Sequence, residues 1–245
     1  MLRLNCDLGE SFGSWKMGED ELVIPLIDMA NVACGFHAGD PLVMQKSVKE
    51  LKKHGVQIGA HVGYPDLVGF GRRSLKCSFD EIEAFSIYQT GALRGVCRAN
   101  GVTLEYVKPH GALYNDMMRD DEILRAIMSA ISKIDSSLKL MILSTCKNSY
   151  YEEMAKEFGL KLIFEVFADR AYTNEGYLVP RTQEGAVLHS VQEVKKRIDM
   201  LKREGKLLSI DKKELSLRAD SLCVHGDTKE AVEFVRVIRS YLDEV

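Results

Sequence analysis

Short apolar runs alternate with longer amphipathic segments along most of this chain. The apolar runs, which predict strands, cover 2–6, 30–34, 56–61, 103–108, 138–143, 161–167 and 221–225. The amphipathic segments, which predict helices, cover 41–54, 80–99, 120–133, 149–158, 190–204 and 228–242. Strands that alternate with helices favour parallel pairing through right-handed crossovers, with the helices outside the sheet. The pattern therefore predicts an α/β protein with seven parallel strands.

Capping signals and loop lengths refine this prediction. N-cap or first-turn residues stand at three of the predicted helix starts: Asp40-Pro41, Ser78-Phe79-Asp80-Glu81 and Asp227-Thr228. Two long stretches, 62–76 and 168–188, interrupt the alternation after the third and sixth strands, where long loops are usually functional. No linker-like segment divides the chain. Residues 1–245 are therefore expected to form one β/α-barrel domain, distorted or incompletely closed in comparison with a TIM barrel.

Composition excludes several classes of protein. The 245 residues carry 33 basic and 36 acidic side chains, a formal net charge of −3, which gives no general attraction to nucleic acid or anionic membranes. The six cysteines are scattered without a C-x-x-C pair, as is typical of free thiols in a reducing compartment. No apolar stretch approaches the roughly 18 to 20 residues that span a bilayer. A soluble cytoplasmic protein is expected.

Dense groups of polar residues follow most of the predicted strands. They are Asn5-Cys6-Asp7-Leu8-Gly9-Glu10, Cys34-Gly35-Phe36-His37-Ala38-Gly39-Asp40, Gly59-Ala60-His61 with Arg72-Arg73, Lys108-Pro109-His110-Gly111, Glu165 with Asp169-Arg170, and His225-Gly226-Asp227. In a barrel the loops after the strand C-termini meet at one face, so these groups are expected to converge. Such a density of titratable residues indicates an enzyme.

These groups resemble the LamB/YcsF family, which is assigned as the A subunit of bacterial 5-oxoprolinase. The resemblance continues through Gly63-Tyr64-Pro65-Asp66, Gly69-Phe70-Gly71-Arg72-Arg73, Val107 to Asn115, Glu165 to Tyr172, Leu178 to Arg181 and Val224 to Thr228. It covers essentially the whole chain, and the combination of motifs is highly specific. One departure is Val62, where relatives usually carry proline, and this bears on the shape of the third-strand loop.

The resemblance implies a fold, a reaction and partners. The fold is a seven-stranded β/α barrel similar to that of sugar deacetylases. The reaction opens the lactam of 5-oxo-L-proline to L-glutamate. It is coupled to the hydrolysis of ATP, which is accompanied by magnesium, to ADP and phosphate. Two further subunits, B and C, take part. The chain lacks the G-x-x-x-x-G-K-[ST] phosphate loop, so we expect the partners to supply the nucleotide chemistry.

The first three strands supply a candidate base and candidate ligands. Asp7 shares a strand face with Asn5, and we interpret Asp7 as a general base or metal ligand, the alternative being a cap for the following turn. Asn5, and Glu10 further into that turn, are candidates for substrate binding. His37 and His61 with Asp7 form a possible site for zinc or another divalent ion. The favoured interpretation, however, is that both histidines bind substrate by hydrogen bonds.

The fourth and sixth strands supply the remaining catalytic candidates. Lys108 and His110 flank Pro109, which stiffens the strand exit. A lysine at the end of a buried strand is costly unless it serves a charge, so we interpret Lys108 as stabilising an oxyanion or a phosphate. The alternative is an ion pair with Glu165. The predicted catalytic group is therefore Asp7, Lys108, His110 and Glu165.

Further substrate contacts are expected from the long loops and the last strand. Adjacent side chains in an extended loop diverge, so one of Arg72 and Arg73 is expected to clamp a carboxylate while the other pins the loop. Asp169 and Arg170 form either a substrate contact or a local ion pair that orders the 168–188 loop. His225 is predicted to point into the barrel.

Two other functions remain compatible with the sequence. A stand-alone, metal-dependent hydrolase of acylated sugars or other amides would contain stoichiometric metal and lose activity to a chelator. A non-catalytic binding or docking subunit would keep turnover in the assembled complex after Asp7→Asn or Lys108→Ala. The density of titratable groups at the strand ends favours the lactam-cleaving subunit over docking alone.

Overall fold

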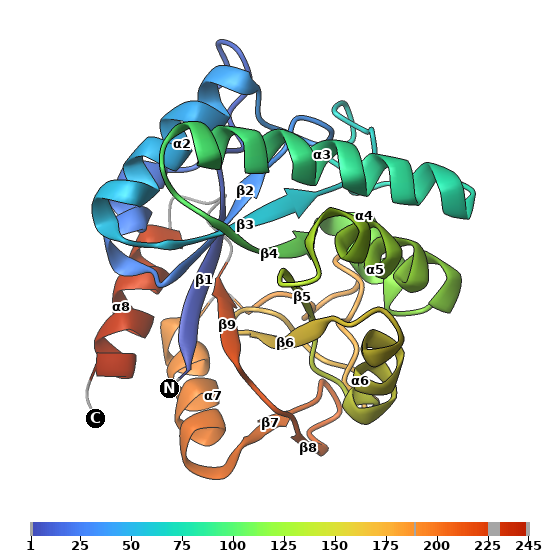
Figure 1. Cartoon of the computed structure of the whole chain (residues 1–245). Coiled ribbons are helices and arrows are strands. Elements are labelled where there is room, and N and C mark those ends of the chain that lie inside the picture. The colour runs from blue at the N-terminus through green and yellow to red at the C-terminus, as the bar shows by residue number, and fades with distance from the viewer. Residues whose placement is uncertain (1, 189, 225–230, 244–245) are drawn as a thin grey trace.

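Seven parallel strands form a closed barrel in this computed structural model, which describes residues 2–188, 190–224 and 231–243. The strand order around the barrel is β1-β2-β3-β4-β5-β6-β9 (Figure 1). Their bounds are β1 (Arg3–Leu8), β2 (Met29–Ala33), β3 (Gln57–Val62), β4 (Leu104–Pro109), β5 (Lys139–Leu143), β6 (Lys161–Phe167) and β9 (Ser221–Val224). The predicted barrel of seven parallel strands is confirmed, and its closure rules out the incompletely closed form.

Helices surround the barrel on its outside (Figure 1). The long ones are α2 (Pro41–His54), α3 (Phe79–Ala99), α5 (Asp121–Asp135), α6 (Asn148–Glu157), α7 (Val191–Glu204) and α8 (Ala231–Asp243). Two of the predicted caps are present: the Asp40 side chain accepts hydrogen bonds at the start of α2, and Ser78 and Glu81 form a capping box on α3. The predicted cap at Asp227 lies outside the described residues.

Several short elements were not predicted. They are α1 (Asp20–Val23), the 3-10 helix η1 (Ile24–Leu26), α4 (Gly111–Met117) and the antiparallel hairpin of β7 (Lys206–Leu208) and β8 (Glu214–Ser216). Each is too short for hydrophobic periodicity to separate it from a loop. The stretch 62–76 contains no helix or strand beyond the last residue of β3, and isolated bridges at Arg170–Val187 and Tyr172–Leu178 order the stretch 168–188. Both long loops are thus as predicted.

The interior of the barrel has an apolar layer below the strand C-termini. Met29, Tyr106, Met141 and Ile163 form a buried cluster of their own, separate from the main core between barrel and helices. Gly59 makes room for this layer, because a Cβ atom there would lie 2.1 Å from Cε2 of Tyr106. On β2, β4 and β6 the residues two positions further along share the inward face and form a polar layer, which consists of Asn31, Lys108 and Glu165. The apolar layer thus closes the floor beneath that polar layer.

Candidate active site

Lys108 occupies the centre of the polar layer at the carboxyl ends of the strands. Its Nζ atom lies 3.0 Å from Oδ1 of Asp7 and 2.9 Å from Oε1 of Glu165. Oδ1 of Asn5 and Sγ of Cys223 each lie 3.3 Å from the same nitrogen. The Lys108 side chain is only 3% exposed. The predicted alternative of an ion pair with Glu165 is therefore observed, with Asp7 as a second carboxylate on the same ammonium group.

The surroundings keep Lys108 protonated. Burial by itself favours the neutral amine, but Asp7 and Glu165 outweigh it and raise the pKa of Lys108 well above its ordinary value. Cys223 adds no negative charge near neutral pH, because burial raises the pKa of its thiol well above the usual range. Lys108 can therefore donate hydrogen bonds and stabilise negative charge, but it cannot act as a base near neutral pH.

A network of buried amides and hydroxyls fixes the position of Asp7. The side-chain NH2 group of Asn31 lies 2.8 Å from both Oδ1 of Asp7 and Oδ1 of Asn5. The hydroxyl of Tyr106 donates to Oδ1 of Asn31 at 2.7 Å, and the amide of Asn5 donates to the hydroxyl of Ser221 at 2.8 Å. Asn31 was not predicted to take part. The relevant signal is strand register, because Asn31 pairs with Asp7 across β1 and β2.

Tyr114 completes the surroundings of Glu165 and was also not predicted. It lies on α4, and its hydroxyl donates to Oε2 of Glu165 at 2.9 Å. Burial, with a further contribution from Glu165, raises the pKa of Tyr114 well above its ordinary value. The phenol is therefore protonated and holds one carboxylate oxygen of Glu165, while Lys108 contacts the other.

Two of the predicted histidines contact each other directly. Nδ1 of His61 lies 2.8 Å from the carbonyl oxygen of Lys108, and Nε2 of His110 lies 2.9 Å from the carbonyl oxygen of Phe70. The remaining nitrogens, Nε2 of His61 and Nδ1 of His110, face each other at 2.9 Å. The backbone N–H of His110 donates to the carbonyl of Val62 at 2.7 Å. Val62, the residue that departs from the family pattern, is therefore the regular last residue of β3.

His37 and Glu10 complete a compact group of candidate metal ligands. The His37 ring is fully buried and stacks on His110, with centroids 3.8 Å apart. One ligand atom from each of Glu10, His37, His61 and His110 lies within 4.8 Å of the others. This group differs from the predicted metal ligands Asp7, His37 and His61, because it contains Glu10 and His110 and lacks Asp7. Asp7 instead directs Oδ1 to Lys108, with its Oδ2 at 3.4 Å from Nε2 of His61.

The glycine-rich loop after β3 packs closely against these histidines. A Cβ atom on Gly63 would lie 2.8 Å from Nδ1 of His37, and one on Gly71 would lie 2.8 Å from Cδ2 of His110. Gly71 also has a φ of +60°, which disfavours other residues. The two glycines are therefore required for the loop to cover His37 and His110.

The two adjacent arginines of this loop diverge, as predicted. Nε of Arg73 lies 3.0 Å from Oδ1 of Asp66, which also accepts the backbone N–H of Gly69 at 3.0 Å. Arg73 thereby pins the loop. Arg72 packs over the ring of Phe70 at 5.1 Å and lines the cavity beside the catalytic candidates.

The cavity at this face has a volume of about 460 Å³. That size suits a small-molecule ligand. Its lining includes six of the predicted residues, Asp7, His61, Arg72, Lys108, His110 and Arg170, together with the further arginines Arg119 and Arg181. Guanidinium groups bind carboxylates and phosphates through paired hydrogen bonds. The cavity can therefore hold an anionic ligand, and Arg119 is a lining residue that was not predicted.

Arg170 orders the 168–188 loop through carbonyl groups. It donates from Nη2 to the carbonyl of Val179 at 2.6 Å and from Nε to that of Ala186 at 3.3 Å. Burial and the nearby Arg181 lower the pKa of Arg170 to about 10, while Asp169 acts in the opposite direction. The predicted attraction between Asp169 and Arg170 thus acts together with the hydrogen bonds that Arg170 donates to the loop carbonyls. His225 lies outside the described residues.

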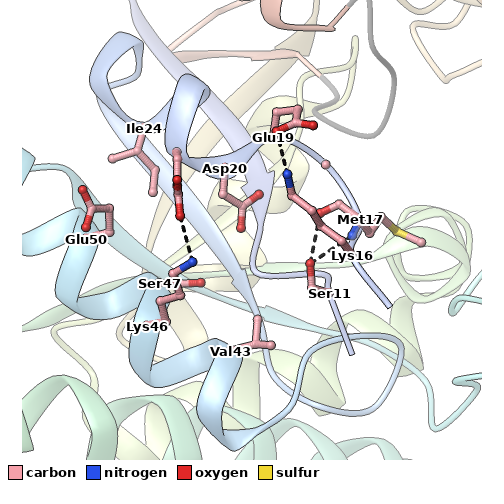
Figure 2. A pocket seen from close by; sticks show the side chains of 12 residues that line it. Ser11, Lys16, Met17, Glu19, Asp20, Ile24, Val43, Lys46, Ser47 and Glu50 are labelled. Atoms are coloured by element: carbon pink, nitrogen blue, oxygen red, sulfur yellow. Dashed lines mark hydrogen bonds and ion pairs between the residues drawn. The ribbon is translucent and has the colours of Figure 1, made fainter. Parts of the chain in front are cut away.

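A smaller hollow of about 220 Å³ lies beside α1 and α2 (Figure 2). Figure 2 shows Lys16 and Glu19 paired at its edge, with their charged atoms 2.9 Å apart. Asp20 lies beside it and accepts the backbone N–H of Gly9 at 2.9 Å. Asp20 therefore holds the turn after β1, in the place where the alternative interpretation put Asp7 as a cap.

Comparisons with known proteins agree with this architecture. The sequence profile of the LamB/YcsF family matches residues 2–245. This chain belongs to the LamB/YcsF family. It is 52% identical over 240 residues to the 5-oxoprolinase A subunit of Chromohalobacter salexigens, covering 98% of this chain and 96% of the relative. The family resemblance stated from the sequence is thus confirmed.

Two further relatives support the assignment to this family. The 5-oxoprolinase A subunit of Vibrio campbellii is 49% identical over 241 residues, covering 98% of this chain and 95% of the relative. The crystal structure of the lactam utilization protein from Thermus thermophilus superposes with a TM-score of 0.91 at 42% identity, covering 99% of this chain and 96% of that one.

Among the described residues, no helix is long and apolar enough to cross a membrane.

Proposed function

We propose that this chain is the lactam-cleaving subunit of an ATP-dependent 5-oxoprolinase, acting with two other subunits, B and C. The reaction opens 5-oxo-L-proline to L-glutamate as ATP becomes ADP and phosphate. The names of the relatives support this role. The observation that carries the proposal is a protonated lysine, Lys108, held between Asp7 and Glu165 beside a cavity lined with arginines.

The buried lysine suits the difficult step of amide cleavage. Transfer of a phosphoryl group to the lactam and the attack of water on the activated carbon both place negative charge beside the reacting carbon, and a preorganised cation stabilises that charge. Lys108 would serve as this cation, because its neighbours keep it protonated. Asp7 would orient and deprotonate the attacking water, since Asn31 and Lys108 hold its Oδ1 atom in place. Arg72 would bind the substrate carboxylate.

ATP would activate the lactam through its oxygen. In this scheme the lactam oxygen attacks the γ-phosphorus, the bond to ADP breaks, and water then adds to the ring carbon. Protonation of the ring nitrogen accompanies cleavage of the carbon–nitrogen bond and leaves the γ-acyl phosphate of glutamate. A second water then attacks the same carbon, the bond from carbon to the phosphorylated oxygen breaks, and phosphate leaves with the original lactam oxygen. Substrate labelled with ¹⁸O at the lactam carbonyl should therefore yield labelled phosphate. Label that appears in phosphate from bulk water instead would refute this route.

The proposal is tested by measuring glutamate release from 5-oxo-L-proline with ATP and magnesium. The chain is assayed alone and with the two partner subunits, and activity is expected only in the mixture. Lys108→Met should lower turnover of the complex by at least about 100-fold, the usual effect of losing one oxyanion-stabilising group. Lys161→Met is the matched control, because Lys161 is an exposed lysine at the opposite end of a barrel strand. A fully active Lys108→Met complex would instead indicate a docking subunit.

A second candidate function is a stand-alone, metal-dependent hydrolase. The group of Glu10, His37, His61 and His110 favours it, because imidazole and carboxylate are typical ligands of catalytic zinc. Such an enzyme would hydrolyse amides or acylated sugars without ATP or partners. Hydrolysis by the chain alone, lost when a chelator removes bound metal, would support this candidate over the lactam-cleaving complex.

A further inference from the structure

The contact between His61 and His110 requires a cation. Carbonyl oxygens only accept hydrogen bonds, so Nδ1 of His61 must donate to Lys108 and Nε2 of His110 must donate to Phe70. In two neutral rings the facing nitrogens would then both carry lone pairs, although they lie 2.9 Å apart. A positive species between or beside them, either a proton or a metal ion, removes this repulsion.

His37 provides a second, independent indication. Its side chain is 0% exposed, and neither ring nitrogen forms a hydrogen bond with any described residue. A buried imidazole without such bonds is costly, and metal coordination is one of the few interactions that compensate for it. Nε2 of His37 lies 3.5 Å from Oε1 of Glu10, and Nδ1 of His110 lies 3.8 Å from the same oxygen.

We propose that Glu10, His37, His61 and His110 bind one divalent transition-metal ion of the zinc type. Three imidazole nitrogens and one carboxylate oxygen match the ligands that zinc and related first-row ions prefer. Two ligands at about 2.1 Å from one ion can be at most about 4.2 Å apart. The ligand atoms span up to 4.8 Å, so the group must contract slightly, and His37 must turn out of its parallel stack.

The number of ligand atoms that face one another favours a metal ion over a shared proton. A proton joins two atoms, whereas this group brings four together within 4.8 Å of one another. Neutral imidazole is the form that coordinates metal. Glu10 supplies a compensating negative charge, and the hydrogen bonds from His61 and His110 to backbone carbonyls fix the tautomers, as is usual around metal sites.

The inference concerns the same face of the barrel as the proposed function but does not depend on it. Magnesium that accompanies ATP would not fill this site, because magnesium prefers oxygen ligands. The test therefore uses the metal itself. The chain, alone and in complex with its partners, is freed of metal by dialysis against a chelator. Binding of Zn²⁺ is then measured by calorimetry, and Co²⁺ binding by its visible absorption.

Wild-type protein should bind one equivalent of Zn²⁺ in the presence of excess Mg²⁺, and Co²⁺ should give the intense bands of a four- or five-coordinate site. His37→Ala should weaken binding by at least about 100-fold, since loss of even an outer partner costs about 10- to 100-fold. His54→Ala is the matched control, because His54 lies on the outer helix α2, away from this group. Glu10→Gln, which preserves shape, should weaken binding at least about 10-fold and serves if His37→Ala does not fold.

Absence of Zn²⁺ and Co²⁺ binding by folded wild-type protein would overturn the inference, as would equal affinities in the two histidine variants. A protein that binds no metal yet forms glutamate with its partners would leave the proposed function intact. Conversely, one equivalent of bound metal in an assembly that never releases glutamate would support the metal site and contradict the proposed function.

Discussion

Replacing Lys108 by methionine should destabilise the fold strongly, because it leaves the buried Glu165 and the partly buried Asp7 without their cation. Lys108 lies 3.0 Å from Asp7 and 2.9 Å from Glu165, and the Glu165 side chain is 0% exposed. Each attraction amounts to about 5 kcal/mol at an effective dielectric constant of about 20. Desolvation of the three ions offsets most of that gain in the wild type. Removing one partner of a buried pair nevertheless typically costs about 3 to 5 kcal/mol, which we expect for Lys108→Met at pH 7.

The loss should depend on pH with a definite sign. Asp7 and Glu165 raise the pKa of Lys108 well above its ordinary value of about 10.4. The contribution of Lys108 to stability is therefore fully present below about pH 10.4 and is lost as the pH rises through the higher folded-state value. The difference between Lys108→Met and the wild type should thus be the same at pH 5 and pH 7 and should shrink only in strongly alkaline solution. Adding Glu165→Gln should recover part of the stability at pH 7.

Urea unfolding followed by far-ultraviolet circular dichroism measures these differences, with the slope of the transition checked between variants. Lys161→Met provides the control, because it removes an exposed lysine from the start of β6 and should change stability by less than about 0.5 kcal/mol. If Lys108→Met unfolds within about 1 kcal/mol of this control at both pH values, the two carboxylates are not held by Lys108 as argued.

Two further predictions concern glycine packing and a buried acid. Gly59→Ala should lower the free energy of unfolding by about 1 to 3 kcal/mol, because the new Cβ would lie 2.1 Å from the ring of Tyr106. Gly91→Ala in helix α3 should raise it by about 0.5 to 1 kcal/mol, because no atom lies within 4 Å of the new Cβ. Thermal unfolding of both variants tests this contrast, and equal effects would contradict it. Burial raises the pKa of Asp20, so its contribution to stability is present below about pH 3.9 and is lost as the pH rises through the folded value. The amide side chain of the Asp20→Asn variant can still accept the N–H of Gly9. In urea titrations this variant should therefore become more stable relative to the wild type as the pH rises from 4.5 to 7.5. A variant less stable than the wild type at both pH values would argue that the charge of Asp20 itself holds the turn.

The barrel could be predicted from the sequence because its strands are short apolar runs with polar residues at one end. Helices α2 and α3 were equally clear, since Asp40 and the pair Ser78 and Glu81 mark their starts. Helix α4 and the β7–β8 hairpin were missed, because each is held by tertiary contacts instead of a repeating pattern. Lys206 and Glu214, for example, pair across the hairpin at 2.6 Å, a contact between residues that gives no periodic signal.

The site was partly predictable for a related reason. Residue type and position at strand ends identified Asp7, Lys108 and Glu165, because parallel strands bring their carboxyl ends together. The pairing of individual atoms depends on register and loop path, which residue types do not encode. Asn31 and Tyr114 were therefore missed, although Tyr114 lies within a segment that carries the family resemblance.

His61 connects the two chemical groups at the barrel mouth. Its Nδ1 donates to the backbone carbonyl of Lys108, while its Nε2 lies 2.9 Å from His110 and 3.4 Å from Oδ2 of Asp7. β3 and β4 pair His61 with Lys108 in register, so neither residue can shift along its strand without the other. A cation that orders the histidines would thus also fix the carboxylate and ammonium groups beside the cavity. Metal binding and lactam cleavage, tested separately, would in this arrangement be linked through a single imidazole ring.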